Sequence, residues 1–468
     1  MPVGISSYGA YVPRFRLAKT TAGWELPGEK PITNYDEDSI TMAVAAAGDC
    51  LAGVDRSTVD ALFFASTTPP YAEKQAASTI ATALDLRRDV LTTDFGGTLR
   101  AGTTALRLAM DAVLAGSARN VLVVAADCRM GVPKGDFDQS AGDGAGAVLI
   151  SKDKLLAEVN GSFFLQEHML DQWRAAGESF MRSWEDRFIT EEGLQRIMVD
   201  ASKAAFQKFN AKPEDFAKAI CYAPTLRRHQ EISRMLGFKP EQVQDPLFGS
   251  MNCTGTAYAM MLLVAALESA QPGQRLYLQN YGDGADVYAL TTTALAGKAD
   301  GHRGVAKLLK SKAILPKYDE YLKWRNLLAA EGVRRPPIPA PSVSALWRER
   351  DQIIRLYGVK CQSCGHVQYP PQVICSFCHT QGKWDKVRLS DKKGEVFTYS
   401  MDYLAPFIDV PLVVTVINFQ GGGRLICTMT DRVLEEIKVG MPVDMAFRKL
   451  FSAGGLNNYF WKSVPVRA

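Results

Sequence analysis

The chain has 468 residues, which is too long for one ordinary domain core and indicates two or three domains. Hydrophobic residues make up 47% and charged residues 22%, values of a globular protein rather than a disordered or fibrous one. The net charge of +4 is too small and too dispersed to predict nucleic-acid binding, and it is compatible with an anionic small ligand.

Hydropathy and cysteine usage indicate the compartment. The N-terminal residues lack a basic start followed by an apolar stretch, and the longest apolar run, Tyr258 to Leu267, fits a buried helix rather than a membrane span. Five cysteines stand alone in apolar settings, which is typical of a reducing compartment. We therefore expect a cytoplasmic protein with neither a nucleic-acid partner nor a membrane partner.

The region between residues 39 and 150 alternates helical and strand patterns, as an α/β layered domain does. A helical pattern over 102–114 ends before Gly116, a residue suited to a helix C-terminus. Strands are expected over residues 61–65, 90–93, 121–126 and 145–151.

A similar order returns further along the chain. Helices are expected over 194–209, 227–236 and 255–270, and strands over 219–222, 275–279 and 285–290. The matching order predicts a duplicated fold whose sheets pack around shared central helices.

The pattern changes after about residue 330. Prolines in RRPPIPAPS favour an extended connector over 331–345, following a first domain over 1–330. A helix is expected to begin near Ala345, in a small domain over 346–385. Strands over 394–401, 412–419 and 424–429 then indicate a small antiparallel barrel of OB type over 386–468.

Two C-x-x-C pairs lie in the segment CQSCGHVQYPPQVICSFC. Each pair can direct two thiolates at one cation, and the short loop between the pairs lets four sulfurs form a tetrahedron. The spacing predicts a structural zinc ribbon. Four sulfur ligands leave no open position for water or substrate, so the zinc is not expected to be catalytic. The predicted ligands are Cys361, Cys364, Cys375 and Cys378.

Residues 1 to about 330 resemble the thiolase superfamily, and within it the hydroxymethylglutaryl-CoA synthases of archaeal and bacterial type. The resemblance lies in ASTTPPYAEKQAASTIATALDL, TTDFGGTLRAGTTAL, DQWRAAGESF, MNCTGTAYAMMLLVAALESA and QNYGDGADVYAL. It implies a five-layer thiolase-like fold, an acyl-CoA substrate and a homodimer. The segment from LYGVKCQSC to GEVFTYS resembles the zinc-ribbon and OB-fold family that partners thiolase-like enzymes as an acyl-CoA-binding subunit.

The chain departs from the synthase pattern at three catalytic positions. Leu99 stands where the family has a nucleophilic cysteine at the start of a buried helix, and leucine cannot form an acyl-enzyme. Thr67 stands in place of the general-base glutamate, and Tyr222 in place of the histidine. Leu99 and Thr67 are then expected only to line the substrate site.

The resemblance also suggests which other residues form the site. Asn252 matches an asparagine that holds the thioester oxygen, although Cys253 or Ser250 could align there instead. Gly282 and Gly284 keep a close-approach loop, and Arg100 and Arg227 are candidate phosphate contacts or else solvated helix residues.

Tyr222, Asp283 and, as a weaker alternative, Tyr281 are the candidates for proton transfer. Tyr222 could instead only fill the vacated pocket, and Asp283 could be an ordinary turn residue. His229 and His168 are expected at the surface of polar helices.

Three functions are considered. The leading hypothesis is a retro-aldolase, a lyase that cleaves a β-hydroxyacyl-CoA without covalent catalysis, as the likeness to steroid side-chain aldolases suggests. The second is a condensing acyltransferase with relocated groups, for example Cys128 or Cys253 as acyl carrier. The third is a non-catalytic acyl-CoA-binding scaffold.

Overall fold

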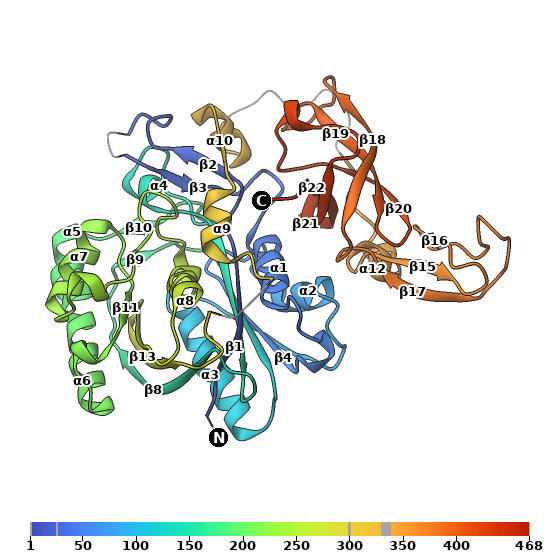
Figure 1. The fold of residues 1–468 in the computed structure, drawn as a ribbon. Helices are drawn as coiled ribbons and strands as arrows, with labels where there is room; N and C mark the ends of the chain where they lie inside the picture. Colours follow the sequence, from blue (N-terminus) through green and yellow to red (C-terminus); the bar gives the residue numbers. More distant parts are fainter. Residues whose placement is uncertain (1, 25–26, 298–300, 329–337, 468) are drawn as a thin grey trace. The chain divides into compact units, whose positions relative to one another are not determined.

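The computed structural model describes residues 2–24, 27–297, 301–328 and 338–467, which form two compact units (Figure 1). The first unit ends at Tyr318. The second begins at Asp319 and also takes in the short segments Asn34–Glu37 and Thr82–Asp85. The predicted boundaries at residues 330, 345 and 385 stay predictions, and residues 331–337 of the predicted connector lie outside the described residues.

A nine-stranded sheet forms the centre of the first unit, in the order β11-β12-β13-β8-β1-β7-β6-β4-β5. β4, β5 and β6 are parallel, and β11 is parallel to β12. The apolar runs of β4, β6 and β11 are buried, as parallel strands covered by helices require, whereas β5 at the edge of the sheet is partly exposed. The strands are β1 (Gly4–Tyr11), β4 (Ala61–Ala65), β5 (Leu91–Phe95), β6 (Val121–Asp127), β7 (Gly144–Ser151), β8 (Ala157–Gln166), β11 (Lys218–Cys221), β12 (Arg275–Tyr281) and β13 (Gly284–Thr292).

The two halves of this sheet repeat one topology, which confirms the predicted duplication. β4 and β6 are parallel and β6 turns back into antiparallel β7, just as β11 and β12 are parallel and β12 turns back into β13. The halves meet where β1 pairs with β8 over only two residue pairs. The helices of this region are α1 (Ser39–Cys50), α2 (Ala76–Ala83), α3 (Ala101–Ala115), α6 (Arg196–Phe209), α7 (Leu226–Met235) and α8 (Tyr258–Ser269).

Helices α3 and α8 lie between the half-sheets, with α1 and α2 outside one half and α6 and α7 outside the other (Figure 1). This is the five-layer arrangement expected from the resemblance. α8 is apolar almost all round because sheet or helix covers every side of it. Gly102 of α3 lets the turn before α8 come close, since a methyl group there would lie 2.9 Å from the Thr256 carbonyl oxygen.

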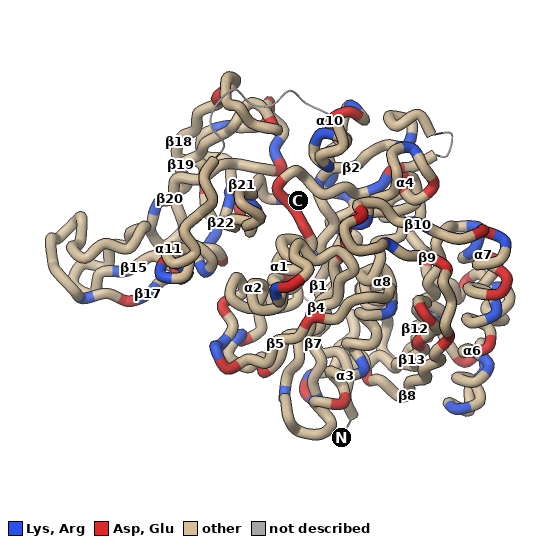
Figure 2. The backbone as a smooth tube through the Cα atoms, turned by 180° about the vertical axis from the view of Figure 1, so that it is seen from behind, with Lys and Arg blue, Asp and Glu red and all other residues tan. Residues whose placement is uncertain are grey.

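The charged residues of the first unit lie mainly on its outer helices. Seen from behind in Figure 2, residues of both signs alternate along α6 and α7, whereas the central strands carry few. α6 continues a π-helical segment, η2 (Ile189–Gln195), that follows α5 (Asp186–Phe188). In the first unit the structure also contains β2 (Phe15–Ala18), β3 (Glu29–Pro31), β9 (Gln172–Trp173), β10 (Arg182–Ser183), β14 (Ala313–Ile314), α4 (Asp136–Ser140) and α9 (Gly304–Lys310).

The second unit contains a small three-stranded sheet and a five-stranded barrel. The barrel order is β20-β19-β18-β21-β22, and a parallel bridge between Met429 and Ser463 brings the end of β20 to β22. This confirms the predicted OB-type barrel, although its last two strands were not anticipated. Its strands are β18 (Gly394–Asp402), β19 (Leu412–Phe419), β20 (Arg424–Thr428), β21 (Pro442–Ala453) and β22 (Leu456–Pro465).

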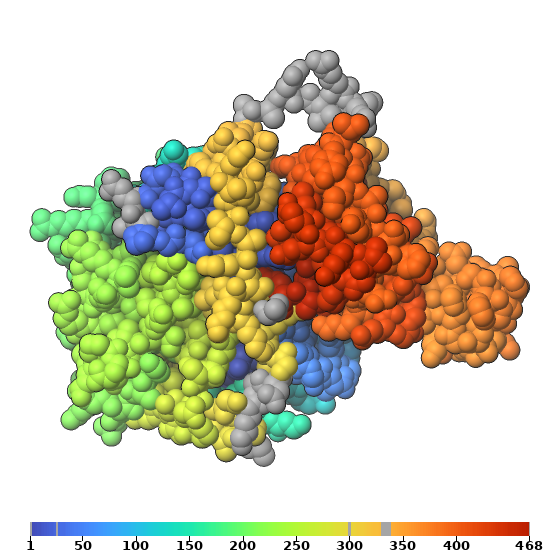
Figure 3. Space-filling model, turned by 45° about the horizontal axis from the view of Figure 1, so that its top comes forward, coloured from blue at the N-terminus to red at the C-terminus, as the bar shows by residue number. Residues whose placement is uncertain are grey.

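The three-stranded sheet consists of β15 (Tyr357–Cys361), β16 (Val367–Gln368) and β17 (Trp384–Arg388), and its residues gather as one compact knob in Figure 3. Short helices α11 (Val343–Arg348) and α12 (Arg350–Ile353) precede it, and α10 (Tyr318–Trp324) spans the division between the units. Among the residues that the structure describes, no helix is long and apolar enough to cross a membrane.

Candidate active site and zinc site

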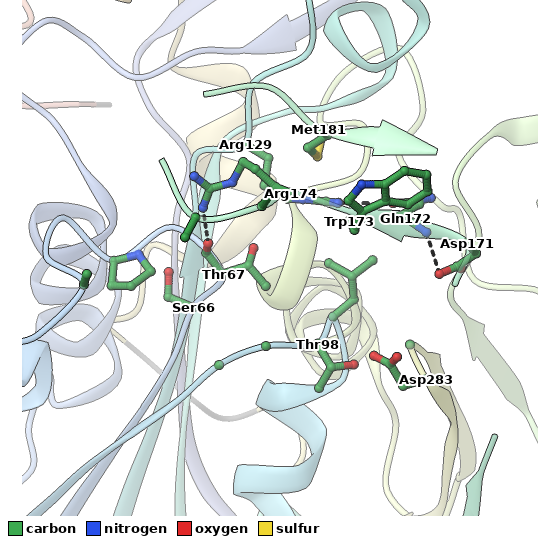
Figure 4. A pocket seen from close by; sticks show the side chains of 18 of the residues that line it. Ser66, Thr67, Thr98, Arg129, Asp171, Gln172, Trp173, Arg174, Met181 and Asp283 are labelled. Atoms are coloured by element: carbon green, nitrogen blue, oxygen red, sulfur yellow. Dashed lines mark hydrogen bonds between the residues drawn. The ribbon is translucent and has the colours of Figure 1, made fainter. Parts of the chain in front are cut away.

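The candidate active site is a cavity of about 530 Å³ in the first unit. It lies where the parallel strands β4 and β5 end, at the start of α3 and beside the end of β12. In open α/β sheets, ligands bind at such carboxyl ends of strands. Its walls come from residues 66–72, 96–99, 171–177 and 281–283, together with Arg129 and Met181 (Figure 4).

Asp127, the last residue of β6, holds one wall of the cavity in place. Its fully buried carboxylate accepts hydrogen bonds from the backbone nitrogens of Thr67 (2.7 Å), Thr68 (3.1 Å) and Thr256 (2.8 Å). The hydroxyls of Ser66 and of these three threonines also donate to it. The Thr67 hydroxyl is therefore committed to Asp127, and Thr67 lines the site as predicted without being free to act as a base.

Leu99 lies two residues before α3 and lines the cavity, with its side chain packed against the core. Helix α3 begins here without a side-chain cap, and the amide of its first residue, Ala101, donates to the Thr98 carbonyl at 3.2 Å. Gly282 lies close to the backbone just before the helix: a methyl group at this position would lie 3.1 Å from the backbone nitrogens of Leu99 and Arg100. The predicted close-approach glycine therefore contacts the helix start.

Two carboxylates and a phenol face this cavity from the opposite side, and Figure 4 shows both acids. Asp283 is exposed and has a positive φ of 48°. Burial raises the pKa of Asp171, and the neighbouring Asp283 carboxylate raises it further. Burial and the carboxylate of Asp171 likewise raise the pKa of Tyr281, so this phenol stays protonated at neutral pH.

Tyr222 lines a second cavity rather than this one. It is 2% exposed, and its ring stacks on Tyr281 with centroids 6.0 Å apart. Its hydroxyl lies 4.0 Å from the sulfur of Cys253, and burial raises its pKa well above the ordinary value. Tyr222 and Tyr281 are thus brought together, and the role of each in proton transfer stays a prediction.

The structure places several predicted site residues elsewhere. Asn252 lines neither cavity, because its side chain accepts from the Gly249 nitrogen and donates to the Gln139 carbonyl. Gly284 serves strand pairing, since a methyl group there would lie 2.0 Å from the Leu165 carbonyl oxygen. Cys128 also lies outside the residues that line the two cavities.

The two predicted phosphate contacts have protein partners instead. Arg100 forms a 3.0 Å ion pair with the buried Asp286 and also donates to the Leu165 carbonyl. Arg227 lies on the exposed side of α7 and pairs with Glu231 at 2.9 Å. Neither arginine lines either of the two cavities, so these cavities give no support to a role in CoA binding.

Two other arginines, which the sequence analysis did not single out, line the first cavity. Arg174 donates to the Thr67 carbonyl at 2.8 Å, and Arg129 donates to the side chain of Gln172 at 3.1 Å. They lie on the wall opposite the acids in Figure 4. The sequence could have indicated Arg174, because this residue and Asp171 both belong to DQWRAAGESF, one of the segments that carry the family resemblance.

The predicted zinc site is formed in the second unit. The sulfurs of Cys361, Cys364, Cys375 and Cys378 all lie within 4.8 Å of one another, and two of the pairs are 3.6 Å apart. Sulfurs at about 2.3 Å from one ion at tetrahedral corners would be about 3.8 Å apart, so the four thiols fit zinc. The ion would tie β15 to the loop that follows β16 and would supply no chemistry to substrate.

Family models match the second unit. Residues 348–383 match the rubredoxin-like zinc ribbon domain of ChsH2, and residues 386–448 match the C-terminal OB-fold domain of ChsH2.

Solved structures resemble the first unit in fold. MvaS in complex with 3-hydroxy-3-methylglutaryl coenzyme A superposes with a TM-score of 0.61 at 19% identity, over 72% of this chain and 95% of that one. A hydroxymethylglutaryl-CoA synthase complexed with CoA gives 0.63 at 16% identity, over 73% and 95%.

Curated relatives cover the same part of the chain. The hydroxymethylglutaryl-CoA synthase of Methanopyrus kandleri is 30% identical over 348 residues, which are 70% of this chain and 98% of the relative. That of Caldivirga maquilingensis is 31% identical over 346 residues, 70% and 99%. The chain therefore belongs to the hydroxymethylglutaryl-CoA synthase family, and it carries in addition a ChsH2-type zinc ribbon and OB-fold domain.

Proposed function

We propose that this protein is an enzyme that makes or breaks a carbon–carbon bond next to the carbonyl of a CoA thioester. Membership of the synthase family supports an acyl-CoA substrate. The observation that carries the proposal is the cavity at the start of α3, where helix amides face a loop that bears an acid. Amides fixed at such a position stabilise the oxygen charge of a thioester enolate.

The residues that line this cavity favour a route without an acyl-enzyme. Among the described residues that form its walls there is no cysteine, histidine, lysine or glutamate, and Leu99 occupies the start of the helix. The bond-forming step of the family is an aldol addition, which needs only a base, an enolate site and a proton donor. Asp283 is suited to be the base and the protonated Tyr281 to be the donor.

Condensation is the better supported direction, because the relatives are synthases. The alternative in the sequence analysis was also a condensation, by an acyltransferase with relocated catalytic groups. Cleavage of a β-hydroxyacyl-CoA, which the sequence analysis favoured, is the same step in reverse, and no relative named above supports it. Incubating the protein with acetyl-CoA and acetoacetate, and separately with hydroxymethylglutaryl-CoA, would show which direction of this one step runs. Chromatography of the CoA esters is the readout.

A covalent route is the second candidate, because Cys253 lies next to Tyr222, which lines the second cavity. Burial raises the pKa of its thiol, which makes it a poor nucleophile as it stands. Incubation with radiolabelled acetyl-CoA followed by denaturing gel analysis separates the two routes. A stable protein-bound label that disappears in Cys253→Ala but persists in Cys128→Ala would overturn the non-covalent proposal.

A non-catalytic acyl-CoA-binding scaffold is the remaining alternative. In that case Asp283→Asn and Tyr222→Phe would leave the flux through a reconstituted pathway unchanged, whereas loss of acyl-CoA binding would lower it. The enzyme proposal expects Asp283→Asn to lower the rate by about a hundredfold or more while acetyl-CoA still binds.

A further inference from the structure

A second cavity of about 430 Å³ lies beside the first in the same unit. The two cavities share four lining residues, Asp171, Gln172, Met181 and Tyr281. These come from the short β9–β10 region and the end of β12, so one layer of side chains separates the two spaces. The far wall of the second cavity is the π-helical segment η2 and the beginning of α7.

The second cavity is lined by both apolar and polar side chains. Phe137, Ile189, Leu194, Tyr222 and Pro224 supply its apolar surface. The arginines in this lining are already paired, since Arg228 binds Asp186 and Glu231, and Arg182 binds Glu178. Such a lining suits a mostly apolar ligand rather than a phosphate-bearing one.

Tyr281 offers a polar group to this space. The residue is 3% exposed, and its hydroxyl finds no acceptor at good hydrogen-bonding geometry among the described residues, while the nearby Asp171 carboxylate is close enough to raise its pKa. The hydroxyl points toward η2, because a methyl group on Gly193 would lie 3.1 Å from it. Burying a phenol hydroxyl that lacks a well-placed acceptor lowers the free energy of unfolding. A ligand oxygen beside the hydroxyl would accept its hydrogen bond and offset that loss.

We propose that the second cavity is the acceptor site of the reaction: it binds an apolar ketone or aldehyde whose oxygen receives a hydrogen bond from Tyr281. This rests on the proposed carbon–carbon chemistry, with the thioester in the first cavity. The two reactants would then meet at the shared wall. The second cavity would set which carbonyl compounds the enzyme accepts.

The proton and electron movements balance in this arrangement. Asp283 removes a proton from the carbon next to the thioester, and that carbon's electron pair forms the new bond to the acceptor carbonyl carbon. The carbonyl π pair moves to the acceptor oxygen, which takes the proton of Tyr281. The proton that Asp283 removed returns to the Tyr281 phenolate by way of the neighbouring Asp171 carboxylate, so each group ends as it began and no net proton is consumed.

Binding experiments on the full zinc-loaded chain test this without requiring turnover. The probes are methyl heptyl ketone and acetyl-CoA, each titrated by calorimetry. Val132 lines only the second cavity and Ala176 only the first, and both are exposed, so a tryptophan at either position should not disturb folding. Val132→Trp should weaken ketone binding at least about tenfold and leave acetyl-CoA binding within about twofold; Ala176→Trp should do the reverse. Ketone binding that neither variant weakens, or acetyl-CoA binding lost in Val132→Trp, would overturn the assignment.

Two further variants test the hydrogen bond. Tyr281→Phe should lower ketone affinity about fivefold and leave acetyl-CoA binding unchanged, as the loss of one hydrogen bond predicts. Gly193→Ala places a methyl group against the same hydroxyl and should act in the same direction. Unchanged ketone affinity in both would refute the role of Tyr281. If the ketone binds as expected but no carbon–carbon product forms with acetyl-CoA, the proposed function fails while the acceptor cavity stands.

Discussion

Gly282 lies close to the backbone nitrogen of Leu99, leaving little room for a side chain. A methyl group on Gly282 would come within 3.1 Å of that nitrogen and 2.8 Å of the Thr98 hydroxyl. The residue also has a φ of 152°, which L-residues rarely adopt. This contact fixes the loop that carries Asp283 relative to the start of α3, so it sets the distance between base and enolate site in the proposed reaction.

Gly282→Ala should therefore lower both activity and stability. We expect the free energy of unfolding to fall by about 2–3 kcal/mol and the condensation rate to fall by about tenfold or more, because the helix start or the loop must shift. Gly273→Ala is the matched control, since Gly273 has a φ of 80° and open space around it. Urea unfolding of both variants measures the difference, and equal losses would show that backbone strain alone is responsible.

Replacing Asp127 with asparagine, which has nearly the same shape, should destabilise the protein. Each of its carboxylate oxygens accepts a backbone N–H, from Thr67 and Thr68 on one side and from Thr256 on the other. In Asp127→Asn one of these positions becomes an NH₂ group facing an N–H donor, so at least one buried hydrogen bond is lost in either orientation. We expect a loss of about 2–4 kcal/mol in the free energy of unfolding, measured by urea denaturation.

The control for this variant is Asp55→Asn, because Asp55 caps an exposed turn by accepting a hydrogen bond from the Ser57 nitrogen at 2.9 Å. That change should cost at most about 1 kcal/mol. A loss in Asp127→Asn no larger than in Asp55→Asn would contradict the view that Asp127 organises the cavity wall.

Local patterns predicted the fold well and the site only in part. The central strands and helices, the duplication, the ribbon and the barrel follow from periodicity and from cysteine spacing, which are local signals. Gly282 and Leu99 were identified because they lie in recognisable motifs. Asp127 was missed because its partners lie about 60 and 130 residues away in sequence, and nothing near it indicates that they converge.

Burial on one side of a helix was also misjudged. His229 lies in the polar segment LRRHQEISRM and was expected at the surface, yet it is 2% exposed. The helix turns His229, Ile232 and Ser233 inward, and only tertiary packing decides which stripe of a mostly polar helix faces the core.

The burial of His229 makes the first unit sensitive to mild acid. Burial lowers the pKa of this imidazole from 6.5 to about 4, so the folded protein keeps it neutral while the unfolded chain protonates it. The free energy of unfolding is therefore unaffected by this group above pH 6.5. It falls by up to about 3 kcal/mol as the pH decreases from 6.5 toward 4. Thermal unfolding across this range should show the loss, and His229→Leu should flatten it. Replacing the exposed His168 with asparagine should leave the profile as it is, and an unchanged slope in His229→Leu would contradict the assignment.

Zinc should hold only the ribbon together. Cys361 is 1% exposed and its sulfur lies 3.6 Å from that of Cys378, so Cys361→Ser removes one of four convergent ligands. We expect the metal content to fall from about one zinc per chain and the segment 356–388 to become sensitive to protease, because zinc binding supplies much of the folding free energy of such modules. Acetyl-CoA binding should persist, since all residues of the first cavity belong to the first unit. Cys128→Ser, which removes a thiol outside the cluster, is the control and should keep the full zinc content. A protease-resistant, metal-free ribbon in Cys361→Ser would show that the ribbon folds without an ion.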